Sequence, residues 1–185
     1  MKKILIILMF WLVMAGSVSA DERHAGTSAV LASNAAVETQ QTKHTTLEMA
    51  AKRRAIVEVL KRYNSPMTQH ADAFLKACVK YNMDCYLLPA IAGLESSFGV
   101  HIWPDSHNAF GWGGGYIMFT SWEEGIDAVA AGLAKNYIGQ GLLGVDAIGP
   151  KYSASPTWAP RVANFMTQFE NIERNDTLHS AIYSL

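Results

Sequence analysis

Apolar side chains recur at intervals of three and four residues in several separate stretches of this chain, which is the pattern of amphipathic helices. The first two stretches predict helices over about 47–63 and 68–81. The breaker sequence Asn64-Ser65-Pro66 separates them. The second stretch shows the pattern most clearly, and its stripe consists of Ala71, Phe74, Leu75, Cys78 and Val79.

A third helix is expected after Asp84, a residue type that readily caps a helix N-terminus. Pro89 must then lie within or near the first turn, where its missing N–H does least harm. Gly99 provides a natural end for this helix. The helix carries Leu87, Leu88, Ile91, Leu94 and Glu95.

Three more helices are expected in the second half of the chain. The capping box Ser121-x-x-Glu124 opens one, a short helix follows over 145–152, and Pro160 lies in the first turn of the last. Their inward positions are Ile126, Val129, Ala130, Leu133 and Tyr137, then Val162, Phe165, Met166 and Phe169. No strand-length alternation competes with these patterns, so the predicted fold class is mainly α.

The segment HIWPDSHNAFGWGGGYIMFTSW, residues 101–122, has no helical period and is dense in glycine and aromatic residues. We expect a loop here, or a small hairpin around residues 113–115. Glycines let backbone amides approach a ligand, and Phe110, Trp112 and Tyr116 offer faces on which sugar rings can stack. This composition suits a binding cleft, although a turn that covers the core would use the same residues.

The N-terminus has the layout of a secretory signal peptide. Lys2 and Lys3 precede an apolar run over 4–14, and Val18-Ser19-Ala20 forms a small-residue cleavage site. The run is short for a membrane-spanning helix, so we expect cleavage after Ala20 and no stable membrane insertion afterwards. The predicted localisation is therefore export, to the periplasm or outside the cell.

The rest of the chain is expected to form one folded domain with two flanking segments. Residues 21–45 are rich in Ala, Ser, Thr, Gln and Asn and predict a flexible tether. Residues 46–175 carry the helical patterns and form the domain, and residues 176–185 form a C-terminal tail. The domain is long enough to bury a core of its own.

The charged residues argue against a nucleic-acid partner. Without Lys2 and Lys3, the 15 Lys and Arg residues become 13, against 16 Asp and Glu, and no basic stripe is present. A substrate recognised by neutral hydrogen bonding and stacking, such as carbohydrate, fits this composition better. No cofactor is expected.

Cys78 and Cys85 are the only cysteines, in the sequence CVKYNMDC. Export to an oxidising compartment favours a disulfide between them, with two buried thiols as the alternative. A metal site is not expected, because no second Cys/His cluster lies nearby.

Glu95, in AIAGLESSFGVHIW, is the only acidic residue between Cys85 and Pro104. It lies in the last turn of its expected helix, where the partial negative charge of the helix end and apolar neighbours both favour the protonated carboxyl. A carboxyl that stays protonated can donate a proton to a glycosidic oxygen as a general acid. The alternative is an ordinary solvated glutamate.

Four blocks occur in the order GLESSFG, NAFGWGGG, FTSWEEGI and KYSASPTWAPRVANF. Together they resemble the glucosaminidase-type (mannosyl-glycoprotein endo-β-N-acetylglucosaminidase-like) domain of the lysozyme-like superfamily. The preceding YNMDCYLLPAIAG is similar to the approach helix that these domains share with lytic transglycosylases. The resemblance covers about residues 65–169. It implies a lysozyme-like helical fold that cleaves the β-1,4-linked glycan strands of peptidoglycan.

The resemblance also implies roles for individual residues. Glu95 matches the catalytic acid, and Asn108, Phe110 and Gly111 match an N-x-F-G block that shapes the glycan cleft. Tyr152 in KYSAS matches a tyrosine that faces the catalytic glutamate. Ser155-Pro156 stand where the family often has an aspartate, so the role of that residue does not carry over.

A second catalytic carboxylate is harder to identify. Retaining glycosidases hold two carboxyls roughly 5 Å apart and inverting ones roughly 6.5–9.5 Å apart. Asp105 is the nearest acid after Glu95 and is the candidate. Without it, the substrate's own N-acetyl group, or the 6-hydroxyl of a muramic residue, would have to attack the anomeric carbon.

Three functions therefore stay open on the sequence. The first is a peptidoglycan hydrolase of the endo-β-N-acetylglucosaminidase type, and the second is a lytic transglycosylase that uses the same Glu95. The third is a non-catalytic peptidoglycan-binding component of an envelope-spanning machine, whose partner the sequence does not identify.

Overall fold

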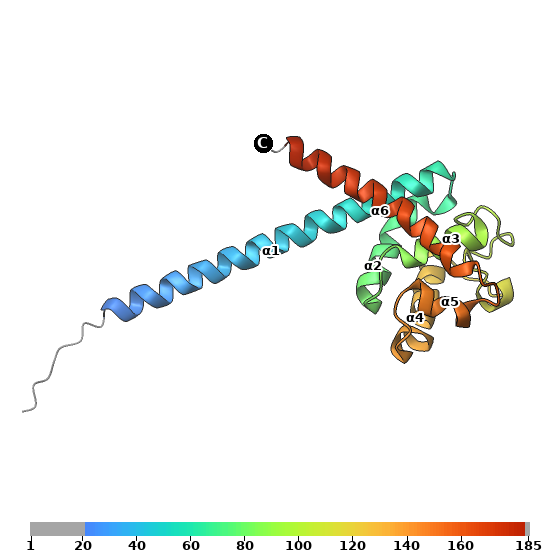
Figure 1. The fold of residues 1–185 in the computed structure, drawn as a ribbon, viewed down its shortest axis with the longest axis horizontal. Helices are drawn as coiled ribbons and strands as arrows, with labels where there is room; N and C mark the ends of the chain where they lie inside the picture. Colours follow the sequence, from blue (N-terminus) through green and yellow to red (C-terminus); the bar gives the residue numbers. More distant parts are fainter. Residues whose placement is uncertain (1–20, 184–185) are drawn as a thin grey trace, which may run out of the picture. The chain divides into compact units, whose positions relative to one another are not determined.

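The structure is a computed structural model that describes residues 21–183, with side chains described over 37–178. The expected signal peptide, 1–20, lies outside the described residues. Within them the chain forms α-helices and short 3-10 helices and no β-strand, so the mainly α prediction is confirmed (Figure 1). The elements are α1 (Asp21–Arg62), η1 (Pro66–His70), α2 (Ala71–Tyr81), α3 (Leu87–Ser96), η2 (Trp112–Gly115), α4 (Trp122–Asn136), η3 (Ile138–Gln140), α5 (Val145–Tyr152) and α6 (Trp158–Tyr183).

The chain divides into two compact units between Lys43 and His44. The first unit is helical from Asp21 onward, whereas the composition of residues 21–45 predicted a flexible tether without regular structure being assigned to it. Alanine, glutamate and glutamine favour helix intrinsically, which accounts for this difference. This segment has few large apolar residues that could pack against a core, and the side chains over 37–48 are accordingly exposed.

The second unit is built around a core to which every predicted apolar stripe contributes. On α1 the buried positions begin at Ala51, in the part of the helix predicted over 47–63. The helix ends where expected, because Asn64 has a left-handed backbone and Ser65 accepts a hydrogen bond from the Met67 N–H. The largest fully buried side chains are Phe74, Phe98, Phe110, Phe169, Ile56, Leu60, Met67, Leu88, Ile91, Ile126, Leu133 and Ile148.

A disulfide joins the end of α2 to the segment before α3. Cys78 and Cys85 are bonded, with their Cα atoms 4.8 Å apart, which confirms the predicted bridge. Asn82 ends α2 in a left-handed conformation, and the Asp84 carboxylate accepts a hydrogen bond from the Tyr86 N–H at 2.7 Å. The disulfide and this hydrogen bond together fix the position at which α3, the helix that carries Glu95, begins.

Helix α6 packs along α3, and α5 lies against the beginning of α6 (Figure 1). The rings of Tyr86, just before α3, and Phe169 of α6 stack with centroids 5.2 Å apart. The short helix predicted over 145–152 is confirmed as α5, and Pro160 lies in the first turn of α6 as expected. This packing brings the ends of α3, α5 and α6 together.

In the described part of the chain, no helix has the length and apolar character needed to cross a membrane.

Candidate functional site

Helix α3 ends with a left-handed turn that displays Glu95. Ser97 and Phe98 both have positive φ, and the Phe98 N–H donates to the Ala92 carbonyl at 2.9 Å. This is a Schellman-type end, and it stops the helix at Ser96, before the predicted Gly99. The turn folds the Phe98 ring back over Gly93, where a Cβ would lie 2.6 Å from the ring. Gly93 is therefore required by the close approach of Phe98.

Glu95 lines a cleft with a volume of about 380 Å³. Part of the lining comes from the loop before and within η2, and part from residues at the ends of α4 and α5. Among the residues that line this cleft, Glu95 is the only carboxylate. The full lining consists of Glu95, Phe110, Gly111, Trp112, Gly113, Gly114, Tyr137, Tyr152 and Ser153.

The surroundings of Glu95 differ from the sequence expectation. The apolar residues of α3 are buried in the core, whereas the Glu95 side chain is exposed toward the cleft. The predicted desolvation by apolar neighbours is therefore wrong, because those neighbours occupy the other faces of the helix. The direct partner is instead Trp158, whose indole N–H donates a hydrogen bond to Glu95 Oε1 at 2.9 Å.

Tyr152, the last residue of α5, lines the same cleft as Glu95. Its ring stacks on Trp158 with centroids 4.5 Å apart, and its hydroxyl donates to the Phe110 carbonyl at 3.4 Å. Burial, followed by the negative charge of Glu95, raises the pKa of Tyr152 above its ordinary value. The hydroxyl consequently stays protonated at neutral pH and acts as a neutral dipole beside the acid.

The buried side chain of Asn108 forms hydrogen bonds that connect backbone groups of the cleft loop. Its side-chain amide donates to the Trp112 and Ile117 carbonyls at 2.9 and 3.1 Å, and its oxygen accepts the Trp112 N–H at 2.9 Å. The residue is buried and does not line the cleft. Asn108 was predicted to bind substrate, but in the structure its side chain holds the shape of the loop.

The predicted cleft residues Phe110, Gly111 and Trp112 line the hollow, but Phe110 is only 2% exposed, so its ring does not offer the open face expected for sugar stacking. The glycine run forms η2 and not a hairpin, with left-handed backbone at Gly111, Gly113 and Gly114. A Cβ on Gly113 would lie 2.6 Å from the Ile117 side chain, so the tight turn itself requires glycine here.

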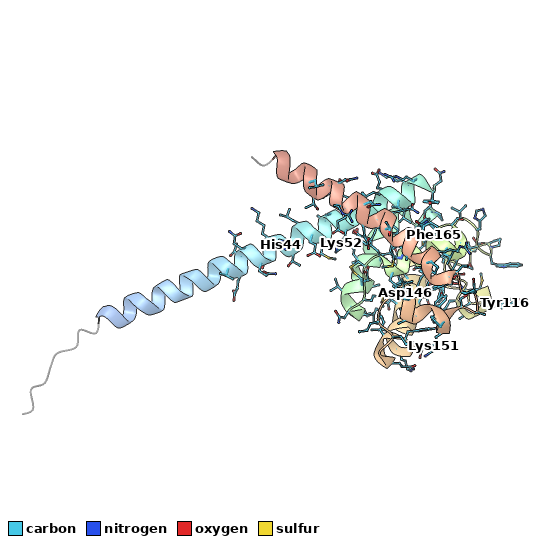
Figure 2. All side chains as sticks on the ribbon, viewed as in Figure 1. His44, Lys52, Tyr116, Asp146, Lys151 and Phe165 are labelled. Carbon is cyan, nitrogen blue, oxygen red and sulfur yellow. A yellow bond between two sulfur atoms is a disulfide. The ribbon has the colours of Figure 1, made fainter. Side chains whose placement is uncertain are left out.

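Besides Asn108, two further predicted site residues do not line the cleft. Asp105 is exposed in a left-handed loop position and is not among the residues that line the hollow. Tyr116 is 90% exposed, and Figure 2 shows its side chain at the outer edge of the folded unit. The structure thus brings Glu95, Tyr152, Phe110, Gly111 and Trp112 together and leaves these two outside.

The chain matches no protein-family model and no curated protein with which it was compared.

Sequence reasoning missed three residues of this site: Trp158, Tyr137 and Ser153. Tyr137 was assigned only to the core face of α4, and Ser153 and Trp158 belong to no helical stripe. The available signal was the position of Trp158, which begins the last helix shortly after Tyr152. A large aromatic with one polar N–H usually finds a hydrogen-bond partner when it is buried.

Proposed function

We propose that this protein is an exported peptidoglycan hydrolase that cleaves β-1,4 glycosidic bonds of glycan strands, in the manner of an endo-β-N-acetylglucosaminidase. The observation that carries the proposal is the presence of one carboxyl, Glu95, in a cleft that is otherwise lined mainly by glycine and aromatic residues. A polymer can enter such a cleft, and the aromatic faces suit sugar rings. The resemblance of the four sequence blocks supports the same substrate.

In the proposed reaction, Glu95 donates its proton to the glycosidic oxygen as the bond to the anomeric carbon breaks. The carbonyl oxygen of the substrate's own N-acetyl group attacks that carbon, because the cleft lining offers no second carboxylate. Glu95, now ionised, takes a proton from the water that opens the resulting ring. The neutral Tyr152 hydroxyl orients its dipole toward the positive charge that develops on the sugar.

A lytic transglycosylase is the second candidate, and the same single carboxylate favours it. Glu95 would again protonate the glycosidic oxygen. It would then accept the proton of the 6-hydroxyl of a muramic residue as that oxygen attacks the anomeric carbon. The product is an anhydro sugar, formed without water.

Export is part of the proposal. The signal-peptide layout of residues 1–20 and the Cys78–Cys85 disulfide both support an oxidising destination, the periplasm or the outside of the cell. A third reading keeps the cleft for binding peptidoglycan within an envelope machine and assigns no turnover to Glu95.

The test is digestion of purified sacculi, followed by mass spectrometry of the new muropeptide ends. Reducing N-acetylglucosamine ends would support the hydrolase, and anhydro-muramic ends would support the transglycosylase. Binding without new ends would overturn both enzymatic proposals.

Glu95→Gln should lower the rate of product formation about 10²- to 10⁴-fold, because the amide is too weak an acid to transfer a proton to the glycosidic oxygen. Glu58→Gln is the matched control, since Glu58 is an exposed residue that forms an ion pair with Arg62 four positions on and does not line the cleft. Its products should equal those of the wild type. Full activity in Glu95→Gln would contradict the catalytic assignment.

A further inference from the structure

We infer that Trp158 is a positioning residue for the acid, because its indole N–H occupies Glu95 Oε1 and leaves Oε2 to carry the proton toward the cleft. The inference rests on the proposed role of Glu95 as general acid. It concerns which of the two carboxyl oxygens reacts, and what holds that oxygen in place.

The indole is well suited to hold a carboxyl in one orientation. It has a single donor, it does not titrate, and the Trp158 side chain is only 4% exposed. Its ring stacks on Tyr152, and it begins α6, the helix that packs along α3. Gly149 leaves room for the first turn of α6, since a Cβ there would lie 2.9 Å from the Ala159 Cβ, whereas its 3.5 Å from Trp158 Cε3 would be an ordinary contact. The donor is thus fixed by burial and stacking on one side of Glu95.

The other carboxyl oxygen, Oε2, lies near Gly111, a residue of the cleft lining. A Cβ built on Gly111 would lie 3.9 Å from Glu95 Oε2, so the backbone at Gly111 passes close to this oxygen. Gly111 and Glu95 both line the hollow. The two oxygens therefore have different surroundings, with Oε1 on the indole and Oε2 on the substrate side.

This difference decides where the proton of the acid form resides. A protonated carboxyl has one carbonyl-type oxygen, which is the better acceptor, and one hydroxyl oxygen. The indole N–H selects Oε1 as the acceptor, so the proton is carried by Oε2. That oxygen is the one able to deliver it to a glycosidic oxygen in the cleft.

The same hydrogen bond strengthens during the reaction. When the proton leaves Oε2, the carboxyl becomes negatively charged, and a hydrogen bond to a charged acceptor is stronger than one to a neutral acceptor. Only interactions that are stronger in the transition state than in the ground state raise kcat. Loss of the indole N–H should therefore lower kcat and leave KM nearly unchanged.

Trp158→Phe is the direct test, because it removes the N–H and keeps an aromatic ring against Tyr152. On a soluble glycan substrate, kcat should fall about 10- to 100-fold, the range for one hydrogen bond to a charged group. KM should stay within about twofold, since no substrate contact is removed. Trp103→Phe is the matched control, because Trp103 is 73% exposed and does not line the cleft. Its kcat should equal that of the wild type.

The indole N–H resonances provide a readout that needs no turnover. The Trp158 resonance, assigned by its absence in Trp158→Phe, should move in Glu95→Ala, while that of Trp103 should stay in place. An unmoved Trp158 resonance, or a wild-type kcat in Trp158→Phe, would overturn the positioning role alone. Sacculi untouched by the wild-type protein would instead overturn the proposed function, and the resonance would still report whether the pair exists.

Discussion

The hydroxyl of Ser96 donates a hydrogen bond to the backbone carbonyl of Ala109 at 2.7 Å, which ties the last turn of α3 to the loop on the far side of the cleft. The same oxygen accepts the Gly99 N–H at 2.8 Å, and Ser96 is buried. Because Ser96 follows Glu95 directly, this contact fixes the acid relative to Phe110 and Gly111. One buried side chain therefore connects the helix turn that carries Glu95 to the loop that lines the cleft.

Ser96→Ala should lower the free energy of unfolding by about 1–3 kcal/mol, because it leaves the Ala109 carbonyl and the Gly99 N–H without this partner. Urea unfolding measures the change. Ser155→Ala is the control, since the Ser155 hydroxyl is exposed, and its effect should stay within about 0.5 kcal/mol. Equal effects of the two substitutions would contradict the role given to Ser96.

Reduction of the Cys78–Cys85 bridge should lower the melting temperature. The cysteines are 7 positions apart, and closing such a short loop stabilises the folded state by about 2–3 kcal/mol in the chain-entropy account. Thermal unfolding with and without a reducing agent measures this. A Cys78→Ala, Cys85→Ala double variant should melt at one temperature in both buffers. An unchanged transition of the wild type on reduction would show that the bridge contributes nothing.

Asp105→Asn should leave glycan cleavage at the wild-type rate, because Asp105 is exposed and lies outside the cleft lining. The measurement is the rate of release of muropeptides, with Glu95→Gln run beside it as the variant that should lose activity. A loss in Asp105→Asn as large as that in Glu95→Gln would mean that the loop moves Asp105 into the cleft and that a second carboxylate takes part.

Stability should decline above about pH 10, the ordinary pKa of tyrosine. Burial is the main cause that raises the pKa of Tyr86 and of Tyr152, with further contributions from Glu173 and Glu95 respectively. Above about pH 10 the unfolded chain loses these protons while the folded protein keeps them. The contribution of the two tyrosines to the free energy of unfolding is therefore complete below that pH and decreases above it.

Urea unfolding at several values between about pH 8 and 11 would measure this decline, which spans the ordinary tyrosine pKa. A Tyr86→Phe, Tyr152→Phe double variant should lose less stability over the same interval than the wild type. The same slope in both proteins would show that other groups cause the alkaline loss.

The helices were largely predictable because their signals are local. The breaker at Asn64-Ser65-Pro66, the capping serine at Ser121 and the spacing of apolar residues each act within a few residues. The end of α3 was predicted less well. Non-glycine residues, Ser97 and Phe98, adopt the left-handed turn there, and the gain that favours it is the burial of the Phe98 ring.

The candidate site was only partly predictable. Glu95, Phe110, Gly111, Trp112 and Tyr152 line one cleft, as the sequence blocks suggested. The Asn108 side-chain amide forms hydrogen bonds with the backbone of the loop. The residue type alone could not show whether that amide faces a ligand or the backbone.

The sequence by itself determined the mainly helical class, the positions of most helices and the disulfide, because periodicity, capping and cysteine pairing act over short separations. The tertiary structure alone decided the environment of Glu95. The hydrogen bond that Glu95 accepts from the indole N–H of Trp158, 63 residues away, arises from the packing of α6 along α3. A contact at that separation depends on how helices pack, and no local pattern encodes it.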